Sequence, residues 1–338
     1  MYIDNNKINK YISFWLLSIF IVVSLMIVVG GLTRLTDSGL SITQWQLFSG
    51  IIPPLNINQW NNYFDLYKKI PEYKIQNFSM TLDEFKVIFW WEFIHRLLGR
   101  LIGILFLIPL IFFTLKLGFK KTIQFHIIFI LICLQGFIGW YMVSSGLVDR
   151  VDVSHYRLAL HLVLAFILLS LILWNYLIYR KIKIPYQKFN KFFPVFLLFL
   201  LFSQIIVGAF VSGMDAGKIY NTWPLMGDNY FPDDNSLMNL FIPSVFDDPS
   251  LVQFIHRNLA YLIIFFYLII LFKTYKDKLS NFFKIINVVG LLLILQVLLG
   301  IMTLIFGAQM LISSMHQVSS IFLVSSCIYF LYLNKKIN

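Results

Sequence analysis

Long apolar stretches are the feature that most constrains this chain. About eight runs carry almost no charge, and each is long enough to cross the hydrocarbon core of a bilayer as a helix of roughly 20 residues. The composition agrees, because 59% of the 338 residues are hydrophobic, which leaves too few polar residues to cover a water-soluble domain. We therefore predict an all-α integral membrane protein with spans over residues 11–32, 88–115, 123–143, 158–179, 193–211, 252–272, 282–306 and 310–333.

The charge pattern predicts how these spans are oriented. Acidic residues gather in the connection 212–251, which holds six aspartates against Lys218 alone. The tails and the alternate connections are basic and carry only Asp4 and Asp277 as acids. Under the positive-inside rule the basic segments are cytoplasmic, so both termini are expected inside. The basic residues concerned are Lys7, Lys10, Lys116, Lys120, Lys121, Arg180, Lys181, Lys183, Lys188, Lys191, Lys273, Lys276, Lys278, Lys284, Lys335 and Lys336.

The formal net charge of +11 arises from these predicted cytoplasmic segments and reflects membrane topology. We therefore expect no nucleic-acid partner. The first span is too long and too poorly flanked for a cleaved signal peptide, and no arginine-rich amphipathic leader precedes it. These features favour a bacterial inner (plasma) membrane over a mitochondrial one.

Four histidines lie near the starts of the second, fourth, sixth and eighth spans, which places them on the outer side. His95 and His256 are 161 positions apart, in FIHRLLGRLIG and FIHRNLAYL, and His161 and His316 are 155 positions apart. A single histidine on an apolar helix is more often a core residue than a ligand. Four at matching depth instead indicate axial ligands for two hemes, because neutral imidazole binds heme iron well and facing helices can hold it from both sides.

The two other histidines fall outside this pattern. His126 lies at the cytoplasmic end of the third span, and we expect a structural role for it. His155 lies in an outer loop, where we expect a solvated side chain, with a place at the rim of a bound group as the alternative.

Further matches extend the histidine pattern into an internal repeat. Because each unit would contain an even number of spans, the units would share one orientation and form a parallel repeat. We predict two tandem four-helix bundles, residues 1–185 and 186–338, joined by the cytoplasmic linker 180–191. The matched pairs are Asp37/Asp215, Gly39/Gly217 and Trp45/Trp223 at an offset of 178, and Gln135/Gln296 and Gly139/Gly300 at an offset of 161.

Charged residues stand beside the first histidine of each pair. Arg96 and Arg257 directly follow His95 and His256, and charged groups at this depth need a partner. Heme propionates would suit the arginine fork. Helix-end anchoring, or pairing with loop carboxylates such as Asp37 or Asp215, is the alternative.

The two halves differ three residues before these histidines, where Glu92 corresponds to Gln253. Residues at i and i+3 share a helix face, so both side chains should point towards the heme region of their own half. A carboxyl in an apolar site can exchange protons and stabilise positive charge, which favours a catalytic role for Glu92. The alternative is that Glu92 pairs with Arg96 and anchors the helix.

The cysteines exclude covalent heme attachment. Cys133 and Cys327 both lie inside apolar spans, and the chain contains neither a CxxCH motif nor a CxxC pair. We therefore expect any heme to be bound noncovalently.

Taken together, these segments resemble the heme A synthase family over essentially the whole chain. The resemblance rests on GGLTRLTDSGLSITQWQ, FWWEFIHRLLGRLIG, VSHYRLALHL, VSGMDAGKIYNTWPLM, LVQFIHRN and ISSMHQVSS. The chain is similar to the proteobacterial and mitochondrial type, which lacks the cysteine pairs that other members carry in outer loops.

This resemblance implies a membrane oxidoreductase that converts heme O to heme A by oxidising a porphyrin methyl group to a formyl group, for terminal oxidase assembly. It implies a substrate-heme site at His95, His161 and Arg96, a heme b cofactor at His256, His316 and Arg257, and Glu92 as the catalytic acid. The implied partners are heme O, heme O synthase, terminal oxidase assembly factors, an unidentified electron acceptor and membrane lipid.

The residues alone indicate only a di-heme membrane protein. Two other functions therefore stay open at this point. One is a cytochrome b-type electron carrier, and the other is a heme-binding chaperone or exporter without redox chemistry.

Overall fold

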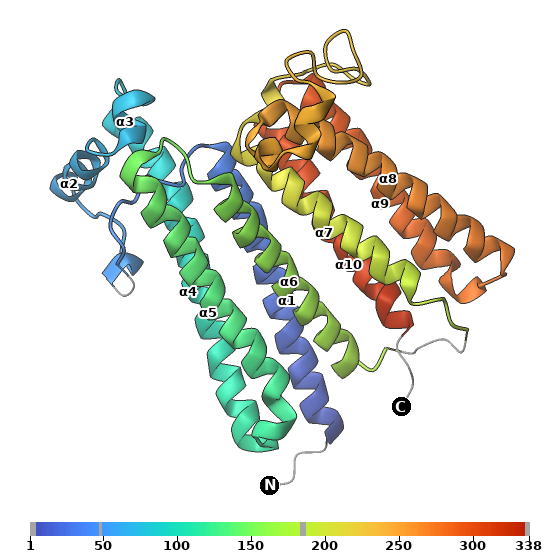
Figure 1. The fold of residues 1–338 in the computed structure, drawn as a ribbon. Helices are drawn as coiled ribbons and strands as arrows, with labels where there is room; N and C mark the ends of the chain where they lie inside the picture. Colours follow the sequence, from blue (N-terminus) through green and yellow to red (C-terminus); the bar gives the residue numbers. More distant parts are fainter. Residues whose placement is uncertain (1–4, 47–48, 183–186, 335–338) are drawn as a thin grey trace. The chain divides into compact units, whose positions relative to one another are not determined.

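The computed structural model describes residues 5–46, 49–182 and 187–334 of the chain (Figure 1). Within this part, eight helices are long and apolar enough to cross a membrane, which confirms the predicted multi-pass membrane protein. Asp4, Lys183, Lys335 and Lys336, and the predicted boundary between residues 185 and 186, lie outside the described residues. The eight helices are α1 (Asn5–Leu35), α4 (Leu82–Leu117), α5 (Phe119–Asp149), α6 (His155–Tyr179), α7 (Phe192–Gly213), α8 (Pro249–Lys276), α9 (Ser280–Ile305) and α10 (Met310–Leu333).

The lipid environment explains why these segments are helical and why their hydropathy predicts them. In hydrocarbon every backbone N–H and C=O needs an internal partner, which a helix provides within one segment. On α4, Ile104, Ile108 and Ile111 are at least half exposed, whereas Phe106 and Leu110 are buried. Both faces of this helix are therefore apolar, as expected where one face packs on protein and the other meets lipid.

Several helices extend beyond the predicted spans because polar caps, which hydropathy does not detect, fix their ends. The helix α4 begins at Leu82, where the Thr81 backbone N–H donates to Glu84 Oε2 at 2.7 Å and the Thr81 hydroxyl accepts from the Glu84 N–H at 3.3 Å. The helix α8 begins at Pro249, where the Asp248 side chain accepts from the Leu251 N–H at 2.9 Å.

The chain divides into two compact units, residues 22–165 and residues 1–21 with 166–338. In the first unit α4 packs against α5, and the Thr33 hydroxyl on α1 lies 3.4 Å from the Trp91 carbonyl oxygen on α4. In the second unit α7 packs against α8 and α10, and α9 packs against α10 and α8 (Figure 1). The predicted tandem repeat and its domain bounds stay predictions.

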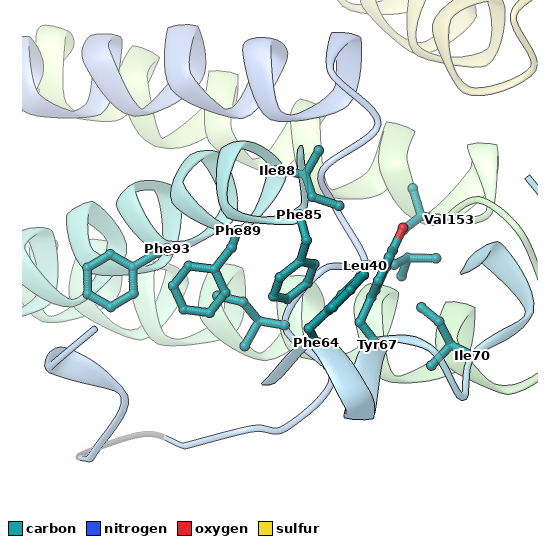
Figure 2. Close-up of a cluster of buried hydrophobic side chains, with 10 residues drawn as sticks. Leu40, Phe64, Tyr67, Ile70, Phe85, Ile88, Phe89, Phe93 and Val153 are labelled. Atoms are coloured by element: carbon teal, nitrogen blue, oxygen red, sulfur yellow. The ribbon is translucent and has the colours of Figure 1, made fainter. Parts of the chain in front are cut away.

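A cluster of buried aromatic and aliphatic residues joins the connection between α1 and α4 to the start of α4. Two short helices belong to this connection, α2 (Ile57–Tyr67) and α3 (Pro71–Ile75). Figure 2 shows Phe85, Phe89 and Phe93 along one side of α4, with Phe64 and Tyr67 of α2 packed beside them. The Phe64 and Phe85 rings stack with 5.1 Å between their centroids. This packing fixes the connection next to the predicted catalytic acid.

The long connection between α7 and α8 contains the short 3₁₀ helices η2 (Ala216–Lys218), η3 (Leu237–Phe241) and η4 (Pro243–Asp247). Asp234 accepts hydrogen bonds from the Ser250 hydroxyl at 2.7 Å and from the Tyr220 hydroxyl at 3.1 Å. These bonds tie the connection to the first turn of α8.

Candidate functional site

Each of the four predicted histidine ligands lies against a glycine of a neighbouring helix. A side-chain Cβ at any of these glycines would meet the imidazole Cε1 at 2.8 to 3.1 Å, which is closer than real Cβ atoms normally approach. Only glycine therefore leaves room for each ring. The pairs are Gly30 on α1 with His95 on α4, Gly139 on α5 with His161 on α6, Gly208 on α7 with His256 on α8, and Gly300 on α9 with His316 on α10.

The structure brings the rings of His95 and His161 close together inside the first compact unit. Their ring centroids lie 6.4 Å apart, and the ring planes are inclined at 60°. In the second unit, His256 and His316 lie within electrostatic range of each other. The four histidines thus form two pairs, each inside one unit; that each pair holds a heme stays a prediction.

Three of these histidines also contact a glutamine that lies four residues before the contacting glycine. Each glutamine Nε2 donates to the backbone carbonyl oxygen of its histidine at 2.9 to 3.1 Å and lies 3.2 to 3.4 Å from a ring nitrogen. Positions i and i+4 share a helix face. One helical turn therefore carries both the glycine that leaves space for the ring and the glutamine that donates the hydrogen bond. The pairs are Gln135 with His161, Gln204 with His256, and Gln296 with His316.

Glu92 is almost completely buried, with 3% of its surface exposed, and both oxygens of its carboxylate accept hydrogen bonds. Oε2 accepts from the Ser41 hydroxyl and the Ile42 backbone N–H, both at 2.7 Å. Oε1 accepts from Nη2 and Nε of Arg96 at 2.6 and 3.0 Å. The carboxylate charge is therefore well compensated, and the acid holds the connection between α1 and α4 against α4.

Arg96 completes this arrangement by donating to loop carbonyl oxygens, from Nη2 to Ile42 at 2.8 Å and from Nη1 to Gln44 at 3.3 Å. One turn further along α4, Arg100 Nη2 donates to the Gln46 carbonyl at 2.8 Å. The connection is thus bound to α4 through its backbone rather than through acidic side chains.

The second unit contains a similar arrangement around Arg257. Its Nη2 donates to the Tyr220 carbonyl oxygen at 3.0 Å, and its Nη1 donates to those of Thr222 and Leu225 at 3.0 and 3.1 Å. Gln253 stands where Glu92 stands in the first unit and donates to the Tyr220 carbonyl oxygen at 3.1 Å. We name these two arrangements the loop clamps, formed by Glu92 and Arg96 in one unit and by Gln253 and Arg257 in the other.

The loop clamps bear on the alternatives left open for Arg96 and Arg257. Asp37 forms an ion pair with Arg34 and Asp215 forms one with Lys218. Both arginines of the clamps donate to backbone carbonyls, partners that a sequence pattern of charges does not reveal. The pairing of Glu92 with Arg96 is present at 2.6 Å.

The two remaining histidines lie in different surroundings. His126 on α5 lies 3.0 Å from the Thr122 carbonyl oxygen and 3.4 Å from the Thr114 hydroxyl of α4, consistent with the structural role expected for it. His155 is only 8% exposed as the first residue of α6, so the expectation of a solvated loop residue was wrong. Helix α6 starts at His155, three residues before the predicted span 158–179, so this residue belongs to the helix rather than to a loop.

Sequence reasoning missed Gln204, Gly30 and Gly208. The signal was available, because QIIVG at 204–208 has the same Q-x-x-x-G spacing as QGFIG at 135–139 and QVLLG at 296–300. Glycine is common in membrane helices, so this spacing points to the histidines only once the structure shows where their rings lie.

Comparison with known proteins identifies the family. A family model described as cytochrome oxidase assembly protein matches residues 13–328. A heme A synthase of Pelagibacter ubique is 51% identical over the full length of both chains. The chain belongs to the heme A synthase family. A heme A synthase of Maricaulis maris is 42% identical, covering 93% of each chain, and one of Rickettsia bellii is 40% identical, covering 95% of this chain and 97% of its own. The heme A synthase family therefore accounts for the whole chain, outer connections included.

Proposed function

We propose that this chain converts heme O to heme A by oxidising a porphyrin methyl group to a formyl group, for cytochrome oxidase assembly. Full-length similarity to heme A synthases supports the reaction. The observation that carries the site assignment is the pair of neighbouring imidazoles of His95 and His161 at 6.4 Å.

This spacing fits an iron atom between the two rings. Metal–imidazole bonds are about 2 Å long, and each ligating nitrogen lies about 1 Å from its ring centre, so two axial imidazoles on one iron place their centres about 6 Å apart. His95 and His161 meet that requirement without a large movement of either helix. We assign them to the substrate, heme O, in the N-terminal half.

We assign His256 and His316 to a resident heme b in the C-terminal half. When bound, this heme would supply one-electron redox chemistry for the substrate reaction. The chain contributes neutral imidazoles, space beside Gly208 and Gly300, and glutamine donors that orient the rings.

The two arginines of the loop clamps differ in what they can offer a heme propionate. All three nitrogens of Arg96 donate to protein acceptors in the structure. Arg257 has a buried Nε for which the described residues supply no hydrogen-bond acceptor. Arg257 is therefore the better propionate ligand, and Arg96 would share its donors between the clamp and the substrate heme.

Glu92 is proposed to assist the oxidation from the turn of α4 that precedes His95. Its ionised carboxylate stabilises positive charge that develops as the methyl carbon is oxidised, and it can take up a proton released there. Arg96, Ser41 and the Ile42 N–H hold the carboxylate in one orientation, so the acid is preorganised for this role.

The basic tails and connections support a location in a bacterial inner membrane with both termini in the cytoplasm. The four histidines then lie near the outer surface. Heme O would arrive from the lipid or from heme O synthase, and heme A would leave for terminal oxidase assembly factors.

Pigment analysis tests the proposed function. The protein is purified from cells that also make heme O, and the extracted hemes are separated by chromatography. Heme A, or heme O together with heme b, supports the proposal, and His95→Ala should remove heme A while retaining heme b. Heme b alone from the wild-type protein would overturn the proposal in favour of a cytochrome b-type carrier, and the lack of any bound heme would overturn it altogether.

A further inference from the structure

Helix α1 differs from α5, α7 and α9, the other three helices whose glycines contact a histidine. Gln135, Gln204 and Gln296 each lie four residues before the glycine that contacts a histidine, whereas Met26 lies four residues before Gly30. Met26 packs against α4, because its Cε lies 3.5 Å from the position of a Cβ on Gly99. Gly99 is one turn beyond His95, so Met26 occupies the place that a glutamine takes at the other three histidines.

A methionine cannot replace a glutamine in this place. The glutamine amide donates hydrogen bonds, whereas a thioether is only a weak acceptor. His95 Nδ1 is buried and has no hydrogen-bond partner within residues 5–46, 49–182 and 187–334. The His95 ring is therefore held by packing against Gly30, without the tie that the other three rings have.

The glutamine tie also sets the tautomer of the ring. The ring nitrogen that faces the amide N–H accepts with its lone pair, so the proton lies on the other ring nitrogen, and iron bound at the accepting nitrogen would replace this hydrogen bond. In the His316 pair, Nε2 lies 3.4 Å from Gln296 Nε2 while Nδ1 lies 3.0 Å from the Gln296 backbone carbonyl oxygen. These contacts hold the His316 ring in one orientation, with the Nε2 lone pair towards Gln296.

We propose that Gln135, Gln204 and Gln296 are positioning residues that orient three of the four histidines, and that Met26 leaves His95 oriented by packing against Gly30 without such a hydrogen bond. Both histidines of the C-terminal site are then oriented by a glutamine, whereas in the N-terminal site only His161 is. This asymmetry suits an N-terminal site whose heme is substrate and must leave, and a C-terminal site whose heme stays. The inference rests on the proposed assignment of heme O and heme b to the two halves.

Heme loss from the purified holoprotein tests the C-terminal half of this inference. Gln204→Met removes one tie, and transfer of heme b to apomyoglobin should become about five-fold faster, the effect of one net hydrogen bond. The low-spin ferric electron paramagnetic resonance signal should also shift or broaden, because it reports the orientation of the imidazoles. Ile206→Met, the same new side chain at an exposed position of α7, is the matched control and should change neither measurement.

The opposite change tests the N-terminal half. Met26→Gln supplies the missing donor and should slow the loss of loaded heme O about five-fold, while heme b loss stays as in the wild type. Leu25→Gln, at an exposed position of the same helix, is the matched control. If Met26→Gln does not fold, Gln135→Met provides the converse measurement, because it should speed heme O loss.

Two different failures can be told apart. If heme b persists in both His256→Ala and His316→Ala, the heme assignment itself is wrong and the proposed function fails with it. If those variants lose heme b, but Gln204→Met and Met26→Gln (or Gln135→Met in its place) release heme at wild-type rates, the glutamines do not position the rings and only this inference is overturned.

Discussion

The backbone N–H of Ile42 donates to Oε2 of Glu92 at 2.7 Å. In the other unit the hydrogen bond runs in the opposite direction, since Gln253 Nε2 donates to the carbonyl oxygen of Tyr220 at 3.1 Å. A carboxylate can only accept, whereas an amide can also donate, so the acid selects an N–H and the amide selects a carbonyl. The acid of the N-terminal half thus has a structural role besides the catalytic one we propose.

Glu92→Gln should separate these two roles. The amide retains an oxygen for the Ile42 N–H, so the fold and the heme b spectrum should persist. Formyl production should fall by about a hundred-fold or more, the usual effect of losing a general acid or base. Heme A yield in extracted pigments is the measurement. Ser41→Ala, which removes one donor but keeps the carboxylate, is the control, and wild-type heme A yield from Glu92→Gln would contradict a catalytic role.

Alanine at the ligand histidines should have different effects in the two halves. His256→Ala or His316→Ala should abolish the low-spin bis-histidine absorption, because one axial ligand is lost. His161→Ala should stop heme O turnover while the heme b spectrum remains. Visible spectra of the purified variants decide this, and a full heme b spectrum in both C-terminal variants would refute the assignment.

The glycines that contact the histidines should not tolerate a methyl group. In Gly30→Ala the new Cβ would meet the His95 Cε1 at 2.8 Å, so the ring must move, at a cost of about 1–3 kcal/mol. We expect lower heme O turnover with heme b retained. Gly103→Ala on α4 has no neighbour within 4 Å and should behave as the wild type. Equal turnover in the two variants would show that the contact is unimportant.

The connection between α1 and α4 should become less stable as the pH rises. Glu72 on α3 is 2% exposed and accepts from the Tyr67 hydroxyl at 3.1 Å, and burial raises its pKa from 4.5 to about 8. The nearby carboxylates of Glu92, Asp152 and Asp37 also raise this pKa. An acid whose pKa is raised by folding binds its proton more tightly in the folded state, so stability is highest below pH 4.5 and falls towards about pH 8.

Hydrogen exchange of α2 and α3 between pH 5 and 8, corrected for the intrinsic rate, measures this effect. Protection should decrease with pH in the wild type and much less in Glu72→Gln, which cannot ionise. Glu84→Gln, at an exposed cap of α4, is the control and should keep the pH dependence. Identical pH profiles for the wild type and Glu72→Gln would contradict the prediction.

Reporter fusions should establish the orientation in the membrane. A reporter that is active only outside the cytoplasm should be active after Asp65 or Asp233 and silent after Lys183 or Lys276, because of the positive-inside rule. The reverse pattern would move all four histidines to the cytoplasmic side.

The sequence by itself determined the spans and placed a histidine near the start of four of them. Apolar runs long enough to cross a bilayer have few other folds available, since lipid requires internal hydrogen bonding, and this fixed the helix count. Ends such as Leu82 and Pro249 were missed because polar caps, rather than hydropathy, set them.

Only the tertiary structure decided what the side chains near the histidines contact. The partners of Arg96 and Arg257 are backbone carbonyls of loops, and every residue has such a carbonyl, so no pattern of residue types could single them out. The burial of His155 and the place of Met26 beside α4 likewise depend on which helix faces which. Local sequence sets where a helix forms, but the neighbours of a side chain are set by packing between segments distant in the chain.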